Sequence, residues 1–420
     1  MRDRGRRWIP VSRAYPRGLL VLAVATFVLF LARGMVLPFL VIYFAQVVGL
    51  GEGLAGAGIA LSSILGVIAT LVLAGTIDRY GARRIVLLAL LALALAHGLL
   101  WLGQTPTRFL ALMALFGIAV NVYWPASDTL ATAFLPAARA GEVFALQRVA
   151  NALGLGLGGM LGGTIVSGGD VPAYRILFLA SAAGILLAAC LVGRSVPNIH
   201  PGHRATAVAN TQGGWRSVLR DRRFLASQLV LLLAIAGFTQ FQVTVPPFLR
   251  REAQFSEGTI GLMFAANTAL VILAQVPFAR WSQGRSHASL FAATGVLWAF
   301  AYSIFAVTPL DGRLATPAVL FYSLAELLFM PASGALVVAL APPALRARYL
   351  AFSSVVWAIG WGGTAWLAGT LLEAGAMLLL WGGTVVMMLT MGLLAWLVLP
   401  RAPQPAEPAT LAIGSEHVDG

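Results

Sequence analysis

Two charged side chains that could do chemistry interrupt long apolar stretches of this sequence. Arg33 stands in the run "LFLARGMVLPFL" and Glu326 in the run "FYSLAELLFM". A carboxylate can bind and release a proton, and a guanidinium can pair with that carboxylate or hold another anion. Each charge costs on the order of 2.5 to 3.5 kcal/mol in the middle of a hydrocarbon layer, so both residues are candidates for a functional role.

The elements that must position these charges are long apolar helices. Hydrophobic residues make up 59% of the 420 residues and charged residues only 10%, whereas about a quarter of the residues in a soluble domain are charged. Stretches such as 19–32, 85–102 and 382–399 are almost continuously apolar and match a hydrocarbon core about 30 Å thick. The sequence therefore predicts an all-α integral membrane protein whose surroundings are the lipid bilayer. No cleavage pattern follows the first apolar stretch, which we expect to be retained.

Twelve membrane spans can be placed along the chain. They cover residues 19–46, 54–75, 85–103, 109–134, 143–166, 174–193, 224–249, 258–279, 288–307, 316–340, 349–371 and 377–399. We expect two six-helix bundles, 19–193 and 224–399, flanked by a basic N-terminus (1–18) and a disordered Pro-rich tail (400–420). The central loop, 194–223, is expected to contain a short surface helix around Trp215, Val218 and Leu219.

The placement of arginine predicts the topology. The formal net charge is +13, and every basic residue is Arg. If the N-terminus is cytoplasmic, 21 Arg residues lie on the cytoplasmic side and five on the opposite side. The positive-inside rule then places both termini in the cytoplasm, with the chain crossing the inner (plasma) membrane many times. The basic excess is therefore a topology signal, and we expect no nucleic-acid partner.

Enzyme and cofactor signatures are missing from the sequence. Cys190 is the single cysteine, so disulfides and Cys-ligated metal sites are excluded. The chain has no His-Glu-x-x-His pair, no phosphate-binding Gly-Lys-Ser/Thr loop and no Gly-x-Ser-x-Gly turn. We expect no catalysis, no metal and no cofactor; an ion gradient, with protons as the first candidate, would supply the energy.

The two halves of the chain are duplicates. An offset of 206 residues sets Trp124-Pro-Ala-Ser127 on Met330-Pro-Ala-Ser333, and an offset of 209 sets Val36-Leu-Pro-Phe-Leu40 on Val245-Pro-Pro-Phe-Leu249. Because each half holds six spans, both copies enter the membrane from the same side, as expected for parallel repeats about an axis along the membrane normal.

The loop between spans 2 and 3 carries a family motif. It reads Asp78-Arg79-Tyr80-Gly81-Ala82-Arg83-Arg84. With the two six-span halves and the basic central loop, it resembles the major facilitator superfamily over nearly the whole chain. The family's loop begins four residues earlier with Gly, where this chain has Ala74. The resemblance implies a two-bundle transporter that works by alternating access.

Within this motif, Gly81 is expected to allow the tight reversal between two antiparallel helices. The resemblance implies that Asp78, with Arg79, Arg83 and Arg84, forms a latch in which the carboxylate sits near a helix N-terminus of the other half, worth about 0.3 to 1 kcal/mol. The alternative is that the motif only anchors the topology.

Three further charges are expected to belong to the same gate. Asp128 is predicted to pair with Arg79 or Arg83, and Arg148 with Glu142 or Asp128. The alternative role of Asp128 is to carry a proton.

Arg33 and Glu326 lie at matching depths. Each stands 14 residues from the cytoplasmic end of its span, which corresponds to about 21 Å. Spans 1 and 10 line the central cavity in the superfamily, so we expect Glu326 to be the proton-binding carboxylate and Arg33 its partner or a sensor of substrate charge. The alternative is a static ion pair that stabilises one conformation. His97, also at mid-depth, is expected to pack through a hydrogen bond rather than to relay protons.

Span 5 carries a glycine motif. Gly154, Gly156, Gly158 and Gly159 resemble the Gly-x-x-x-Gly-Pro-x-x-Gly-Gly motif of proton-coupled drug antiporters, with Leu155 in place of the Pro. Small residues also let helices approach closely, so simple packing explains part of this pattern. The resemblance implies the twelve-span drug/proton antiporter branch.

Polar and aromatic residues at mid-depth outline a substrate cavity. Besides Arg33 and Glu326 the candidates are Asn121, Tyr123, Trp124, Gln240, Gln242, Asn267, Tyr322 and Trp357. Aromatic walls with one or two charges suit amphipathic, often cationic, small molecules. The sequence therefore predicts a monomeric, proton-coupled exporter of such compounds. The alternatives are a carrier for one small metabolite, such as a sugar or an amino acid, and more remotely a membrane sensor that transports nothing.

Overall fold

The computed structural model describes residues 15–135, 139–197, 215–282, 284–342 and 345–399. Within these it describes all side chains except those of residues 74–75, 78, 140–141, 276, 279–280 and 347. The described part is helical and contains no β-strand. The predicted N-terminal segment and C-terminal tail lie mostly or wholly outside the described residues.

Six long helices form the first half. The first is interrupted: α2 (Arg17–Val36) continues through η1 (Leu37–Phe39) into the wide turn η2 (Ile42–Val47). The others are α3 (Glu52–Tyr80), α4 (Ala82–Leu99) with η3 (Leu100–Leu102), α5 (Pro106–Thr132), α6 (Ala140–Ile165) and α7 (Val171–Ser195).

The second half repeats this order. A short helix, α8 (Trp215–Arg220), precedes α9 (Arg222–Thr239), η6 (Gln240–Thr244) and α10 (Val245–Glu252), which together form the seventh span. Then follow α11 (Glu257–Ser282), α12 (His287–Val307), η7 (Gly312–Leu314) with α13 (Ala315–Leu340), α14 (Arg346–Glu373), and η9 (Leu378–Gly382) with α15 (Gly383–Val398). The twelve predicted spans therefore match twelve helical elements, and α8 matches the predicted short helix.

Eleven of these elements are long and apolar enough to cross a membrane by themselves. The twelfth, α6, is less apolar because it carries Glu142, Gln147, Arg148 and Asn151. It packs between α2 of its own half and α11 of the other half. A helix enclosed by protein on two sides needs less apolar surface, which explains its composition.

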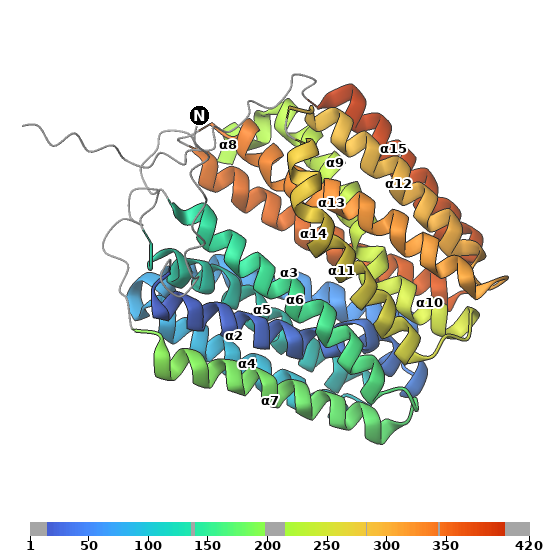
Figure 1. The fold of residues 1–420 in the computed structure, drawn as a ribbon, viewed down its shortest axis with the longest axis horizontal. Coiled ribbons are helices and arrows are strands. Elements are labelled where there is room, and N and C mark those ends of the chain that lie inside the picture. Colours follow the sequence, from blue (N-terminus) through green and yellow to red (C-terminus); the bar gives the residue numbers. More distant parts are fainter. Residues whose placement is uncertain (1–14, 136–138, 198–214, 283, 343–344, 400–420) are drawn as a thin grey trace, which may run out of the picture.

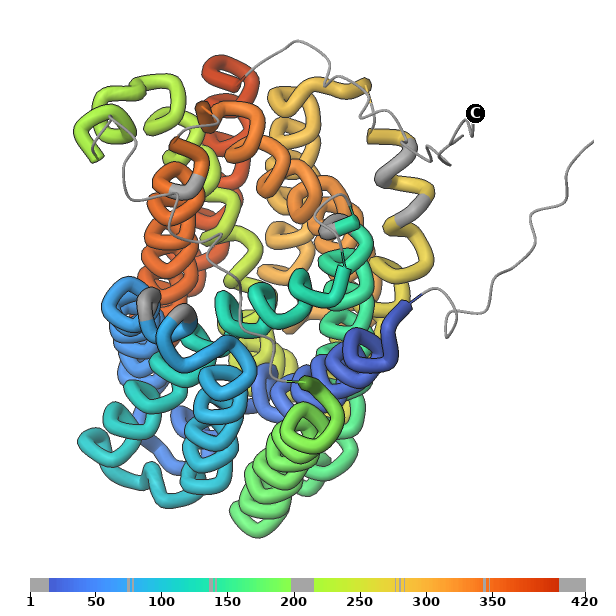
Figure 2. The backbone as a smooth tube through the Cα atoms, turned by 90° about the vertical axis from the view of Figure 1, so that its left-hand side faces the viewer, coloured from blue at the N-terminus to red at the C-terminus, as the bar shows by residue number. Residues whose placement is uncertain are grey.

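The helices form two bundles, drawn in blue to green and in yellow to red in Figure 1. The main contacts between the bundles are those of α3 with α14 and of α6 with α11. Since these are spans 2 with 11 and 5 with 8, each contact is the repeat of the other, as expected for duplicated halves. Figure 2 shows the same two groups of helices from one end.

The first and seventh spans are both irregular beside their proline segments. The α2 helix gives way to η1 at Pro38, and α9 gives way to η6 just before Pro246 and Pro247. Proline lacks an N–H and clashes with the preceding turn, so it breaks the regular ladder and the wide turns absorb the change. These breaks fall on the sequence repeat around Val36 and Val245.

The two ends of the molecule differ. The basic end carries Arg17, the α3–α4 turn, Arg194 and α8; the distal end carries the turns at Gly51, Gly169, Gln254 and Gly375. At the basic end, Gly81 has φ 85° and its N–H donates to the Ile77 carbonyl at 2.9 Å. A residue with a Cβ would be strained there, so Gly81 makes the predicted reversal.

Candidate functional site

A cavity of about 590 Å³ lies between the two halves. Its walls come from α2, α4, α5 and α6 on one side and from α9, η6, α11, α13 and α14 on the other. A volume of this size is within the range of small-molecule sites, about 300 to 1,000 Å³. Aromatic side chains from both halves line it: Phe30, Phe116, Trp124, Phe144, Phe238, Phe264 and Trp361.

Arg33 reaches the cavity from α2 and is held by aromatic rings. Its guanidinium carbon lies 5.1 Å from the centre of the Phe30 ring and 5.9 Å from that of Phe116. Cation–π contacts of this kind stabilise a desolvated charge by about 2 kcal/mol. Among the ion pairs of the described residues, none involves Arg33. The charge is therefore positioned by its wall but not neutralised by it.

Glu326 reaches the cavity from α13 on the opposite wall. Its Oε2 accepts a hydrogen bond from Asn267 Nδ2 at 3.0 Å, and the same nitrogen donates to Ser323 Oγ at 2.8 Å. The amide of Asn267 therefore fixes the carboxylate against α11. The predicted ion pair between Arg33 and Glu326 is not formed in this structure, because each side chain is held by its own half.

His97 also lies on the cavity wall. Its Nδ1 is 2.7 Å from Ser181 Oγ, which in turn is 2.7 Å from the Ala32 carbonyl oxygen. Because a carbonyl can only accept, the single Ser181 proton goes to Ala32, and His97 Nδ1–H must donate to Ser181. The Nε2 atom is buried without a hydrogen-bond partner. The packing bond expected for His97 is present, but this residue is also a cavity residue, which the sequence did not predict.

Asp128 and Arg148 line the part of the cavity nearest the basic end. The described ion pairs include neither of them. The predicted pairs of Asp128 with Arg79 or Arg83 are therefore absent: Arg83 instead donates to the Gly193 carbonyl, and Arg79 lies over the Tyr80 ring. Neither of these contacts involves Asp128, which lines the cavity.

Glu142 has a different partner from the one predicted. Arg139 binds it through Nη2 at 2.8 Å, and Tyr15 donates a hydrogen bond to it at 3.2 Å. Burial raises the pKa of the Tyr15 hydroxyl, and the hydrogen bond to Glu142 acts in the same direction, so Tyr15 remains a donor. Arg148 stands more than one helical turn from Glu142 and lines the cavity. The latch role predicted for Asp78 lies outside the described side chains, and Arg84 is exposed.

The other predicted cavity residues divide into two groups. Trp124, Gln242 and Asn267 lie on the wall. Asn121, Tyr123, Gln240, Tyr322 and Trp357 do not line this cavity. They point into helix contacts instead: Asn121 bonds the Gly117 carbonyl, Gln240 bonds Thr384, and Tyr322 bonds the Phe238 carbonyl. Tyr123 accepts a hydrogen bond from Ser127, and Trp357 packs against Phe238 and Phe329.

Sequence reasoning missed several wall residues on α6 and α11. Those on α6 recur at helical spacing and are Phe144, Gln147, Asn151 and Leu155; those on α11 do the same and are Phe264, Thr268, Val271 and Gln275. Polar groups recurring every three or four residues in a membrane helix mark one face. This spacing in the sequence could have identified the cavity-facing side of both helices.

The glycines of the span 5 motif serve two contacts. A Cβ on Gly154 or Gly158 would overlap the backbone of α2, at Phe27 and Leu31 respectively. A Cβ on Gly156 would overlap Thr268 of α11, and one on Gly159 would come within 3.1 Å of Phe264. One glycine face therefore packs α6 within its own half, and the other packs it against the second half.

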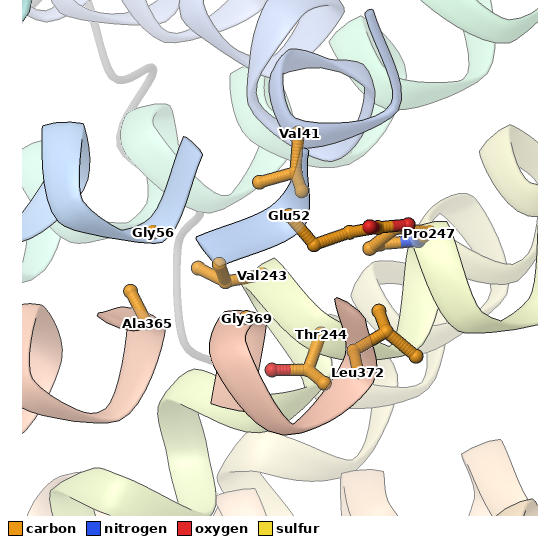
Figure 3. A pocket seen from close by; sticks show the side chains of 9 residues that line it. All are labelled: Val41, Glu52, Gly56, Val243, Thr244, Pro247, Ala365, Gly369 and Leu372. Atoms are coloured by element: carbon orange, nitrogen blue, oxygen red, sulfur yellow. The ribbon is translucent and has the colours of Figure 1, made fainter. Parts of the chain in front are cut away.

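The distal end is closed by bonds between the halves. Arg251 Nη1 binds Glu52 Oε1 at 3.2 Å, Gln46 Nε2 donates to the Pro247 carbonyl at 2.9 Å, and the Gly53 N–H donates to Glu373 at 2.7 Å. Figure 3 shows the small gap beside Glu52 and Pro247, which has a volume of only about 10 Å³. A space of this size holds about one water molecule, so the cavity is sealed at this end.

Comparisons with known proteins agree with this architecture. A model of the Major Facilitator Superfamily matches residues 22–250 and 229–416. The chain belongs to the Major Facilitator Superfamily. It is accordingly a multi-pass membrane transporter and not an enzyme.

Relatives within the superfamily have diverse names. A "Na(+), Li(+), K(+)/H(+) antiporter" of Planococcus maritimus is 26% identical over 82% of this chain and 87% of the relative. The multidrug resistance protein MdtH of Yersinia enterocolitica is 24% identical over 86% of this chain and 89% of the relative.

Solved structures share the superfamily fold at lower identity. A D-xylose–proton symporter has a TM-score of 0.71 at 17% identity, covering 91% of this chain and 97% of that one. A point mutant of the nucleoside transporter NupG has a TM-score of 0.70 at 15% identity, covering 90% of this chain and 98% of that one.

Proposed function

We propose that this transporter exports small amphipathic organic compounds in exchange for protons. The observation that carries the proposal is the position of Glu326, a carboxylate on the wall of a 590 Å³ cavity with no cationic partner among the described residues. A proton and a cationic or polar substrate group can compete for such a carboxylate. Because only one of them can occupy the carboxylate at a time, protons and substrate are expected to cross the membrane in opposite directions.

The aromatic side chains of the cavity wall favour an organic molecule as the substrate. Seven aromatic side chains contribute to the cavity, and flat apolar molecules bind such surfaces by burial and stacking. The resemblance of the glycine motif to that of drug antiporters and the name of the MdtH relative point in the same direction.

The orientation follows from the arginines. We place the basic end, with both termini, in the cytoplasm of a cell whose inner membrane the chain spans. The sealed distal end then faces outward, and the cavity is open to the inside through the region of Asp128 and Arg148. Alternating access would open the distal bonds and close the basic end.

The test is dye transport in proteoliposomes under an imposed pH gradient. Native protein is expected to move ethidium and rhodamine B against proton flow, and Glu326→Gln is expected to lose gradient-driven transport. The control, Asp311→Asn, removes an exposed acid at the distal end and is expected to transport normally. Native-like transport by Glu326→Gln would remove this residue from proton coupling. Failure of every amphipathic dye would remove the proposed substrate class.

A second candidate is exchange of monovalent cations for protons. The name of the Planococcus maritimus relative favours it, and the oxygens of Glu326, Asn267 and Gln242 on the cavity wall are ligands that such cations accept. The volume of the cavity and its aromatic walls exceed what an ion requires, so we rank it second. Proton movement driven by Na⁺, Li⁺ or K⁺ in dye-free proteoliposomes would establish it.

A further inference from the structure

The cavity holds opposite charges on opposite walls. Arg33 belongs to α2 of the first half and Glu326 to α13 of the second, and both side chains line the same space. Neither takes part in an ion pair among the described residues. Asp128 and Arg148, the other charged residues on this wall, lie nearer the basic end. Arg33 and Glu326 are only partly exposed, and a partly desolvated charge is costly without a partner, so this arrangement calls for a ligand that supplies both missing partners.

Each wall keeps its charge in place without neutralising it. The rings of Phe30 and Phe116 hold the guanidinium of Arg33 by their faces, which leaves its N–H donors available. Asn267 donates one hydrogen bond to Glu326 and leaves the second carboxylate oxygen, Oε1, without a partner in the described hydrogen bonds. Both charged groups therefore present unused hydrogen-bonding atoms.

A purely cationic substrate fits only half of this site. Its cation would be attracted by Glu326, but it would share the cavity with the uncompensated charge of Arg33, which repels it. A carboxylate on the substrate would remove that repulsion and accept hydrogen bonds from the planar guanidinium.

We propose that the preferred substrates are zwitterionic amphiphiles, whose anionic group binds Arg33 and whose cationic group binds Glu326 across an aromatic body. This rests on the proposed function, since it specifies the substrate class of the same cavity. Proton binding to Glu326 then releases the cationic group, while Arg33 selects for the anionic group.

A matched pair of dyes tests the proposal. Rhodamine B carries a carboxylate and a cationic xanthylium, and its ethyl ester keeps the cation and lacks the anion. Binding of each dye to purified protein is measured by fluorescence anisotropy, which does not depend on transport. Native protein is expected to bind rhodamine B about tenfold or more tightly than the ester, since charge-assisted hydrogen bonds at a desolvated site have effects of this size or larger.

The variants separate the two charges. Arg33→Gln is expected to weaken rhodamine B binding about tenfold and leave ester binding unchanged or improved, whereas Arg33→Lys retains part of the preference. Glu326→Gln is expected to weaken the binding of both dyes. Arg175→Gln is the control, because it removes an arginine of the same half that lies over the Trp101 ring and is not part of the cavity wall, and it is expected to preserve the preference.

Two results would overturn the proposal. The first is that native protein binds the ester as tightly as rhodamine B or more tightly. The second is that Arg33→Gln weakens the binding of both dyes equally. Either can occur while a pH gradient still drives dye export, which would leave the proposed function intact. Conversely, selective binding without gradient-driven transport would support the site and contradict the proposed export.

Discussion

Arg251 of the second half forms an ion pair with Glu52 of the first half at the distal end, with 3.2 Å between Nη1 and Oε1. The Glu52 side chain is only 7% exposed, and Arg251 also donates to the Leu372 carbonyl. Glu52 is therefore shielded from solvent, whereas Arg251 is 31% exposed and also binds Glu252 at 2.8 Å. The pair joins the halves where the cavity is sealed. Under the proposed alternating access, the pair would hold the distal end closed.

Breaking this pair is expected to favour opening of the distal end. We predict that Arg251→Gln shifts the ratio of closed to open distal ends by about 1 to 2 kcal/mol, because the buried Glu52 loses its cationic partner and keeps only the hydrogen bond from Gln46. Spin labels at Gln104 and Leu310, both exposed at the distal end, would report longer distances in a Cys190→Ser background.

Arg175→Gln is the control for this shift. Arg175 lies over the Trp101 ring within the first half, so its removal changes the charge of the same end without touching a contact between the halves. An equal shift in this control would show that net charge, and not the Arg251–Glu52 pair, sets the balance.

The two glycine faces of α6 are expected to respond differently. We predict that Gly158→Ala destabilises the protein by about 1 to 3 kcal/mol, because the added methyl group overlaps the α2 backbone. We predict that Gly156→Ala, which meets Thr268 of the other half, affects the conformational balance and transport more than the melting temperature. Thermal unfolding in detergent and dye transport distinguish these effects.

Gly363→Ala is the control for both substitutions, since nothing lies within 4 Å of a Cβ at that position. It is expected to be neutral or slightly stabilising, because alanine is the better helix former. Equal melting temperatures for Gly158→Ala and Gly363→Ala would contradict the close contact of α6 with α2.

Ser181 is expected to matter through His97. Ser181→Ala removes the acceptor of the His97 Nδ1 proton and the donor to the Ala32 carbonyl, which leaves buried polar atoms unpaired. We predict a loss of about 1 to 3 kcal/mol in unfolding free energy. The described hydrogen bond of the Ser303 hydroxyl stays within its own helix, at the Ala299 carbonyl, so Ser303→Ala should lower the unfolding free energy less. An equal loss would contradict the special role of Ser181.

Asn267 is expected to position the carboxylate of Glu326. We predict that Asn267→Leu lowers gradient-driven transport about tenfold or more while dye binding at equilibrium changes less, because the carboxylate loses its only described hydrogen-bond donor. Ser323→Ala removes the other partner of the amide and is the control. Normal transport by Asn267→Leu would show that Glu326 is positioned by the rest of the cavity.

The spans, their order and the turn at Gly81 could be predicted from the sequence because these features are local. A run of apolar residues must cross the bilayer whatever surrounds it, and Gly81 is needed wherever the chain reverses with φ 85°. The duplicated Pro-containing segments likewise lie at irregular places in both halves: Pro38 lies in η1, and Pro246 and Pro247 begin α10 directly after η6.

Only the tertiary structure decided which side chains face the cavity and which charges meet. Depth along a helix follows from residue counting, but the direction of a side chain around the helix depends on which neighbours the helix packs against. The side chains of Tyr322 and Asn121 therefore bond to helix carbonyls, whereas those of His97 and Trp361 line the cavity. Arg33 and Glu326 share a depth, yet the separation of the two halves keeps them apart, and that separation is a property of packing and not of either sequence segment.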